Sequence, residues 1–232
     1  MHPETDPDPA WVAGLAGCPS ARAGWAVSRA QAEGALYRHL AREHRSEGRS
    51  SYVEIDAPLE LYAVARLMRP RHILEVGVSS GVSSAYLLRA LKVNRCGRLH
   101  SIDLPRRGPA RRRARRSPGS WSLPPGRESG WAVPRAVRSR WDLRLGDKRD
   151  LLPRLAGELS GIELFVYDVP HDDDDAADEF RMLDRILSPH GVAIVDHGPS
   201  GDLCPALAAW ARRRGTRPLR RAGLGLYGFR AR

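Results

Sequence analysis

The chain has 232 residues, 42% of them hydrophobic and 28% charged, which fits one globular domain with a modest extension and excludes disorder along the whole chain. Its formal net charge is +11, but residues 106–140 hold 11 arginines and one acidic residue, Glu128, and so carry +10. The remainder of the chain is close to neutral. The charge therefore excludes a protein that is basic throughout and concerns one segment only.

Cysteine usage and hydropathy predict the compartment. Cys18, Cys96 and Cys204 lie far apart and form no CxxC pair, which argues against a disulfide framework and against a zinc site. No apolar run reaches the roughly 18 residues that a membrane span needs. We therefore expect a cytoplasmic protein without a membrane partner.

Residues 1–56 are predicted to form an N-terminal arm and a helical extension. Residues 1–20 are rich in Pro, Asp and Gly, which favours a loose arm. Apolar residues then recur at helical spacing over residues 28–44. A further helix is predicted over residues 58–68, because Pro58 stands in its first turn and apolar residues line one face.

Residues 57–232 alternate short apolar runs with helical segments. The window 106–140 interrupts this alternation and is predicted to be an insertion loop, with a short helix near residues 134–139. Apolar strands that alternate with helices predict an α/β fold with a parallel sheet covered on both faces. The predicted strands are 72–77, 99–103, 142–145, 163–168 and 191–196, the predicted helices are 82–92, 148–159, 172–187 and 203–214, and a closing hairpin joins 218–221 to 224–230.

Carboxylates stand at or beside the ends of these predicted strands. The carboxyl ends of parallel strands meet at one edge of a sheet, and ligands of such sheets bind there. A purely structural sheet has no need for acids at these positions. The acidic residues concerned are Glu75, Asp103, Asp147, Asp168 and Asp196.

The first strand passes into a helix through the sequence EVGVSSG, residues 75–81. Gly77 and Gly81 allow a sharp turn and a close approach of backbone to ligand, and Asp103 suits two ribose hydroxyls. A dinucleotide site uses G-x-G-x-x-G, but Ser79 stands at the second glycine and Glu75 would repel phosphate. A cationic nucleoside without phosphate, such as S-adenosylmethionine (SAM), suits the turn better. The alternative is an ordinary strand–turn–helix with incidental glycines.

Most of the chain, from about residue 57 to the final strand, resembles one enzyme family. The segments that carry the resemblance are, in order, ILEVGVSSGVSSAYLLRAL, GRLHSIDLP, ESGWAVP…RW, LRLGDKRDLLPRL, IELFVYDVPHD and LSPHGVAIVDHG. They resemble class I SAM-dependent methyltransferases, most closely the bacterial small-molecule branch that includes macrolide-sugar O-methyltransferases. The resemblance implies a Rossmann-like fold, with a mostly parallel seven-stranded sheet whose last strand is antiparallel.

The resemblance also implies which residues hold the cofactor. Glu75, Gly77 and Gly81 would surround the amino-acid end of SAM, and Ser79 would take the place of a further small residue in the same turn. Asp103 would bind the ribose and Asp147 the adenine amino group.

Asp168 and Asp196 end consecutive strands that are neighbours in this fold, so their carboxylates can converge on one cation. His197 follows directly and is a candidate third ligand. Oxygen ligands with an imidazole suit Mg²⁺ or Mn²⁺ better than zinc. Related metal-dependent enzymes carry Asp, Asn or Glu in place of His197. The sequence therefore leaves three readings open: Mg²⁺, Mn²⁺, or no metal, with Asp196 capping the next turn.

His171 lies three residues beyond Asp168 and resembles the general base of the macrolide-sugar enzymes. Imidazole has a near-neutral pKa and can accept the proton of a hydroxyl while the methyl group is transferred. The alternative is a histidine that caps a helix or is solvated.

These features predict a SAM-dependent O-methyltransferase that acts on a hydroxyl of a small molecule, such as a sugar or a phenol. The arginine-rich window follows Asp103 closely, and we expect it to form a lid over the substrate. Two alternatives are an RNA methyltransferase that uses this window and a SAM-binding protein whose catalytic site has decayed. Nucleic acid is the less favoured partner, because no aromatic residues interleave with the arginines. A homo-oligomer is compatible with the sequence.

Overall fold

The computed structural model describes residues 6–46, 57–105, 123–169, 173–196, 203–221 and 223–231, with backbone alone for residues 173–175. The helices are α1 (Pro9–Ala16), α2 (Ser20–Gln31), α3 (Gly34–Ser46), α4 (Pro58–Met68), α5 (Val82–Asn94), the 3-10 helix η1 (Arg135–Arg140), α7 (Lys148–Glu158), α8 (Asp173–Ile186) and α9 (Pro205–Arg213). The strands are β1 (His72–Val76), β2 (Arg98–Asp103), β3 (Trp141–Leu145), β4 (Ile162–Tyr167), β5 (Leu187–Asp196), β6 (Leu219–Arg220) and β7 (Leu226–Arg230).

The strands of the described chain form a seven-stranded sheet in the order β3-β2-β1-β4-β5-β7-β6. β1 to β5 pair in parallel, and β7 lies antiparallel between β5 and β6. This topology confirms the predicted Rossmann-like sheet with an antiparallel last strand. The strand order reverses at β1 and β4, which places the ligand edge at the carboxyl ends of these strands.

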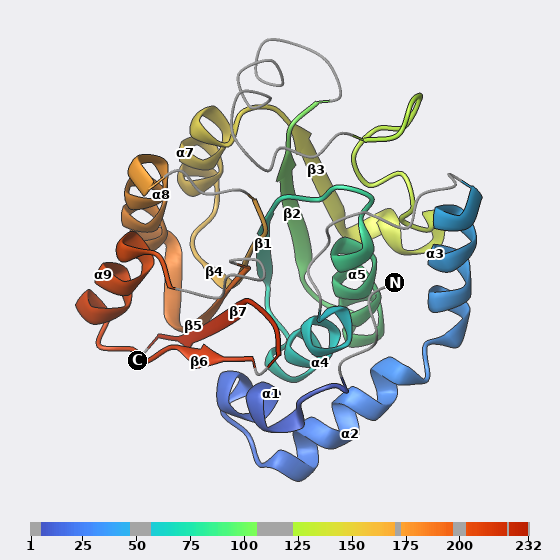
Figure 1. The fold of residues 1–232 in the computed structure, drawn as a ribbon, viewed down its shortest axis with the longest axis horizontal. Coiled ribbons are helices and arrows are strands. Elements are labelled where there is room, and N and C mark those ends of the chain that lie inside the picture. The colour runs from blue at the N-terminus through green and yellow to red at the C-terminus, as the bar shows by residue number, and fades with distance from the viewer. Residues whose placement is uncertain are drawn as a thin grey trace.

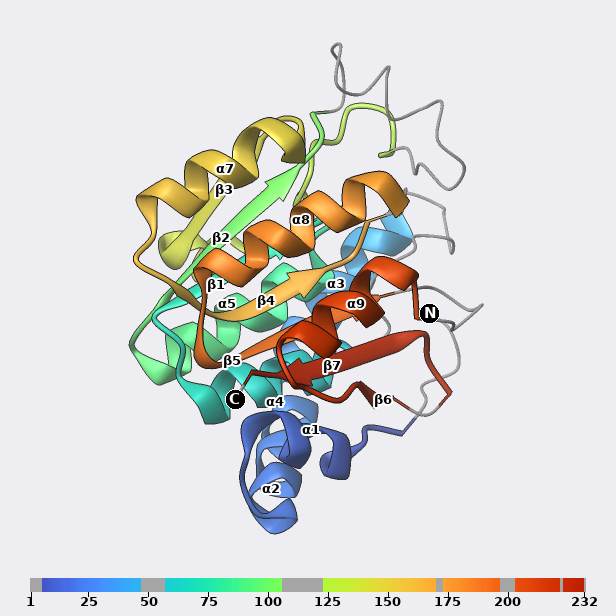
Figure 2. The same cartoon turned by 90° about the vertical axis from the view of Figure 1, so that its left-hand side faces the viewer.

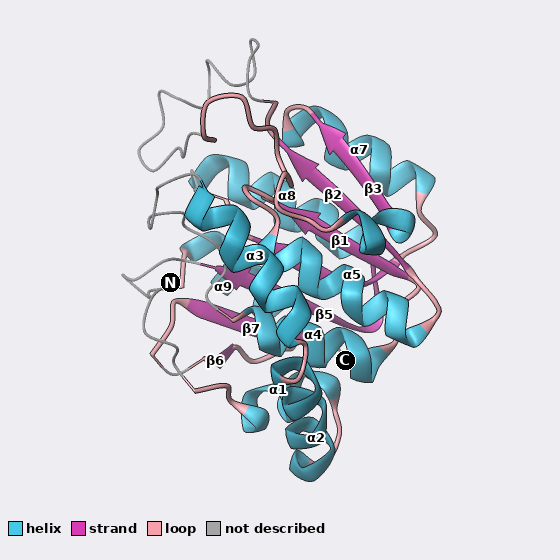
Figure 3. Ribbon diagram, turned by 90° about the vertical axis from the view of Figure 1, so that its right-hand side faces the viewer, coloured by secondary structure: helices cyan, strands magenta, loops and turns pink. Residues whose placement is uncertain are grey.

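Helices cover both faces of the sheet. α7, α8 and α9 lie over one face (Figure 2), and α4 and α5 lie over the other with α3 beside them (Figures 1 and 3). Successive residues of β1 point to opposite faces, so Ile73 joins the core under α4 and α5 while Leu74 joins the core under α7 and α8. A continuous apolar strand is what a doubly covered parallel sheet requires.

The loose arm predicted for residues 1–20 is wrong for the segment that the structure describes. Asp8 accepts hydrogen bonds from the backbone N–H groups of Ala10 and Trp11 and so caps α1. Trp11 and Leu15 are buried, and the indole N–H of Trp11 donates to the Leu219 carbonyl at 2.8 Å. The Pro- and Asp-rich segment is therefore the start of a helix, although its composition alone favours a loose arm.

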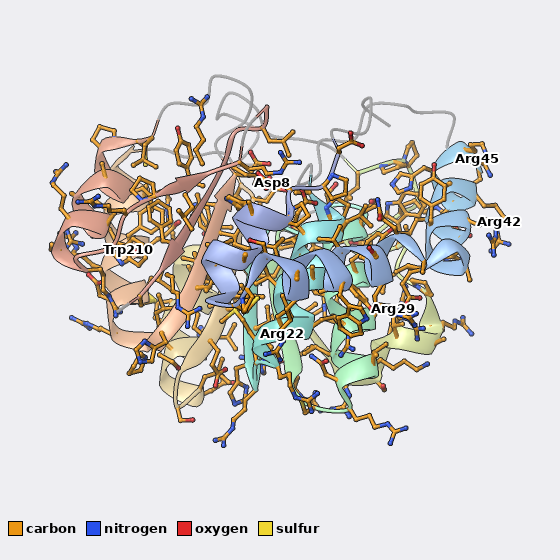
Figure 4. All side chains as sticks on the ribbon, turned by 90° about the horizontal axis from the view of Figure 1, so that it is seen from below. Asp8, Arg22, Arg29, Arg42, Arg45 and Trp210 are labelled. Atoms are coloured by element: carbon orange, nitrogen blue, oxygen red, sulfur yellow. The ribbon has the colours of Figure 1, made fainter. Side chains whose placement is uncertain are left out.

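The single helix predicted over residues 28–44 is also wrong. The structure has α2 and α3 in its place, with a break at Ala32 and Glu33. The buried apolar face of α2 begins earlier, at Ala23, and ends at Ala30, just before the break. Figure 4 shows α1, α2 and α3 along one side of the molecule, with Arg42 and Arg45 of α3 pointing outward.

The other predicted elements agree with the structure to within a few residues. α4 has the predicted bounds, and η1 confirms the short helix in the insertion. β5 starts at Leu187, four residues before its predicted start, and its pairing with β4 shifts register near that end. None of the described helices is long and apolar enough to cross a bilayer.

Candidate functional site

The turn after β1 is built around Gly77. This residue has φ +93°, and a Cβ added to it would lie 1.9 Å from the carbonyl oxygen of Asp168. Its N–H donates to the Ile102 carbonyl, and the Asp168 N–H donates to the Val76 carbonyl. Only glycine lets this turn pass so close to the end of β4. The predicted sharp turn is thus confirmed, with the β4 backbone against it.

Glu75 lies at the base of the same turn and is fully buried. Its carboxylate accepts hydrogen bonds from the hydroxyls of Ser83 at 2.7 Å, Ser84 at 2.6 Å and Ser101 at 2.6 Å. Burial raises the pKa of Glu75 to about 7, although the three hydroxyls oppose the rise. Glu75 therefore links β1, β2 and the first turn of α5 from within the core.

Asp103 faces the turn from the end of β2. Its Oδ2 accepts the backbone N–H of Ser79 at 3.0 Å, and its Oδ1 accepts that of Leu104 at 2.8 Å. Ser79 has φ +49°, a left-handed conformation that points its N–H at the carboxylate. The half-buried carboxylate is thereby fixed beside the turn, where the sequence predicted the ribose site.

Gly81 meets the described end of the arginine-rich insertion. A Cβ at this residue would lie 2.4 Å from Cγ2 of Val133 and 3.0 Å from Cα of Gly130. Gly130 N–H donates to the Ser79 carbonyl, and Ala132 N–H donates to the Ser80 carbonyl. Residues 130–133 therefore pack directly on the turn. Residues 106–122, with the main arginine cluster, lie outside the described chain.

Asp147 lies at the end of β3 and caps α7, since its carboxylate accepts the Arg149 N–H at 3.0 Å. The next residue, Lys148, reaches a buried pair that sequence reasoning missed. Its ammonium lies 2.7 Å from the hydroxyl of Tyr167 and 2.7 Å from a carboxylate oxygen of Glu179. The Tyr167 hydroxyl donates to Glu179. This contact joins the start of α7 to β4 beside Asp168.

Asp168 and Asp196 follow neighbouring strand ends, as predicted. β4 pairs with β5 so that Tyr167 lies opposite Val195, which places the two half-buried aspartates at the same level of the edge. Among the described residues no group of three His, Cys, Asp or Glu side chains is arranged to hold a metal ion. His197, the predicted third ligand, and His171, the predicted base, lie outside the described residues.

The structure thus gathers most predicted cofactor residues around one turn. Glu75, Gly77, Ser79 and Gly81 belong to it, and Asp103 is hydrogen-bonded to it. The serines that hold Glu75 gave no sequence signal, because only the β1–β2 register and the first turn of α5 bring them to the carboxylate.

A family model described as a methyltransferase domain matches residues 74–197, more than half of the chain. No curated protein matches the chain. Among solved structures, a methyltransferase from Geobacter sulfurreducens is similar with a TM-score of 0.57 and 19% identity, over 84% of this chain and 87% of that one.

Two further structures were solved with a cofactor or its product. An O-methyltransferase from Bacillus cereus in complex with SAH has a TM-score of 0.54 and 16% identity, over 85% of this chain and 90% of that one. The O-methyltransferase TomG from Streptomyces achromogenes, involved in tomaymycin synthesis and solved with SAM, has a TM-score of 0.53 and 25% identity, over 84% and 87%. The chain therefore belongs to the methyltransferase-domain family.

Proposed function

We propose that the protein transfers the methyl group of SAM to a hydroxyl of a small molecule, such as a sugar or a phenol. The observation that carries the proposal is the fixed geometry of Asp103, which is held against the glycine turn by the backbone N–H of Ser79 and oriented by the N–H of Leu104, the residue that follows it. The similarity to O-methyltransferases supports oxygen as the methyl acceptor.

The residues around the turn fit the cofactor in charge. Carboxylates surround the edge, which suits the cationic sulfonium and ammonium groups and disfavours a phosphate. Asp103 would accept hydrogen bonds from the ribose hydroxyls, and Asp147 would accept one from the adenine amino group. The backbone of residues 77–81 would face the amino-acid end of SAM. Glu75 would support the turn from within the core, because its hydrogen bonds to Ser83 and Ser84 hold the first turn of α5 in place. SAM, when bound, supplies a methyl group on a good leaving sulfur.

His171 would accept the proton of the substrate hydroxyl as the methyl group moves from sulfur to oxygen. The products are then the methyl ether, SAH and a protonated imidazole that returns its proton to water. A histidine suits this task because its neutral form is populated near pH 7.

A divalent metal would sit at Asp168 and Asp196, which share one level of the sheet edge. Two carboxylates of the described chain supply part of the set that Mg²⁺ or Mn²⁺ prefers. No step above depends on this ion. Measuring turnover with and without a chelator tests whether a metal ion assists methyl transfer.

Methyl transfer to a panel of phenols and sugars, followed by mass spectrometry, tests the proposal. The expected product is 14 Da heavier than the acceptor, because CH₃ replaces H. His171→Ala is expected to keep its affinity for SAH and to lose turnover by about 100-fold or more, the size of a general-base contribution. Unchanged turnover in this variant would exclude His171 as the base, and chelator-resistant turnover would exclude the metal.

A further inference from the structure

The N-terminal extension contacts the candidate cofactor turn through α3. In Figure 1, α3 lies on the outer side of α5 and runs toward the level at which β2 finishes. Only two side chains of this 13-residue helix, Leu36 and Leu40, are buried apolar anchors. Polar contacts therefore contribute much of what fixes its position, and two of them come from histidines.

His44 contacts the turn directly. Its Nε2 lies 2.9 Å from the hydroxyl oxygen of Ser80, and its Nδ1 lies 2.8 Å from the Leu40 carbonyl. A carbonyl can only accept, so Nδ1 carries the hydrogen, and in the neutral ring Nε2 accepts the hydrogen bond from Ser80. The ring also packs on Trp131, with centroids 5.3 Å apart.

Ser80 is fully buried between two segments of the site. Its carbonyl accepts the N–H of Ala132, and the preceding residue, Ser79, donates its N–H to Asp103. A displacement of Ser80 would therefore be transmitted both to the insertion and to the carboxylate at the end of β2. His44 is the α3 side chain that holds Ser80 in place.

We propose that His44 is a positioning residue for cofactor binding, which fixes Ser80 and, through it, the turn that faces Asp103. This inference rests on the proposed function of that turn. It makes His44 the residue of α3 that supports the binding turn, although the side chain of His44 need not touch the cofactor.

His39 provides the matched control. It lies on the same helix, and its Nε2 is 3.0 Å from the Ala132 carbonyl, so it also ties α3 to the insertion. It makes no hydrogen bond to Ser80 among the described contacts. If the substitutions only loosen α3, replacing either histidine should weaken SAH binding. If His44 positions the turn, only its replacement should do so.

The test is calorimetric titration of the full chain with SAH. His44→Ala is expected to raise the dissociation constant about tenfold. His44→Gln, whose amide oxygen can accept from Ser80, should stay within threefold of wild type, and His39→Ala within twofold. In the Ser80→Ala background, His44→Ala should add less than twofold, because the shared hydrogen bond is already gone.

Equal weakening by His39→Ala and His44→Ala would overturn the proposal, as would unchanged binding by a folded His44→Ala chain. If His44→Ala fails to fold, a tenfold loss in the Gln variant would contradict it. Wild-type chain that does not bind SAH would overturn the proposed cofactor site together with this inference. Wild-type binding with no effect at His44 would overturn the inference alone.

Discussion

At the residue scale, Glu75 is the most informative side chain of the candidate site. It is fully buried, and its three hydrogen-bond partners are neutral hydroxyls. A charged carboxylate in such surroundings is costly because hydroxyls replace only part of its hydration. The residue therefore resembles a buried acid whose protonation is coupled to folding.

The stability of the chain should consequently depend on pH through Glu75. Its pKa is raised from an ordinary value of 4.5 to about 7 in the folded chain, so the folded state keeps a proton that the unfolded state releases between these values. Its contribution to stability is complete below about pH 4.5 and is lost as the pH rises to about 7, by about 3 kcal/mol.

Urea denaturation of wild type and Glu75→Gln across this pH range measures the effect. The glutamine variant, which cannot ionise, should show a slope that is flatter than that of wild type and should gain relative stability as the pH rises. Parallel slopes for the two chains would exclude Glu75 as the coupled group.

Gly77 yields a second prediction at this scale. A Cβ there would meet the Asp168 carbonyl at 1.9 Å and would require a positive φ, so Gly77→Ala should displace the turn and weaken SAH binding at least tenfold. Gly24→Ala is the matched control, because nothing lies within 4 Å of a Cβ there and α2 should gain up to about 1 kcal/mol. Similar SAH affinities for the two variants would contradict the role given to Gly77.

At the element scale, the sequence predicted those elements whose signals are local. Pro58 and the apolar face after it define α4, and the apolar runs define β1 and β4. The sequence also predicted an acid, Asp103, at the end of the second strand, and the structure places it against Ser79 of the glycine turn. The serines around Glu75 could not be predicted, because the Glu75–Ser101 pairing depends on strand register. The helix α1 was missed since its buried face packs on α2 and α4, and on the hairpin of β6 and β7, which are brought to it only by the fold.

Trp11 tests whether α1 belongs to the folded core. Trp11→Ala removes a side chain that is 4% exposed and should cost about 3 kcal/mol or more of the free energy of unfolding. Trp25→Ala removes the same side chain from α2 at a position that is 54% exposed, and should cost less than about 1 kcal/mol. Chemical denaturation of both variants measures these free energies of unfolding. Equal small losses would show that α1 does not belong to the folded core and would support the loose arm.

At the scale of the whole molecule, the net charge of +11 is unevenly distributed along the chain, because residues 106–140 carry almost all of it. The sheet places carboxylates at the edge where its parallel strands end, whereas the arginines concentrate in one insertion between β2 and β3. Residues 130–133 of that insertion are hydrogen-bonded to the glycine turn. The net positive charge therefore belongs to one insertion of the sequence and not to the sheet.

We propose that the turn after β1 and Asp103 together bind the nucleoside cofactor. Calorimetric titration with SAH of wild type, Asp103→Ala and Asp178→Ala tests it most directly, because Asp178 is an exposed acid of α8 that pairs with Arg181. Wild type and Asp178→Ala should bind with dissociation constants within twofold of each other, and Asp103→Ala should bind at least tenfold more weakly. Wild-type chain without measurable binding, or Asp103→Ala with wild-type affinity, would contradict the account.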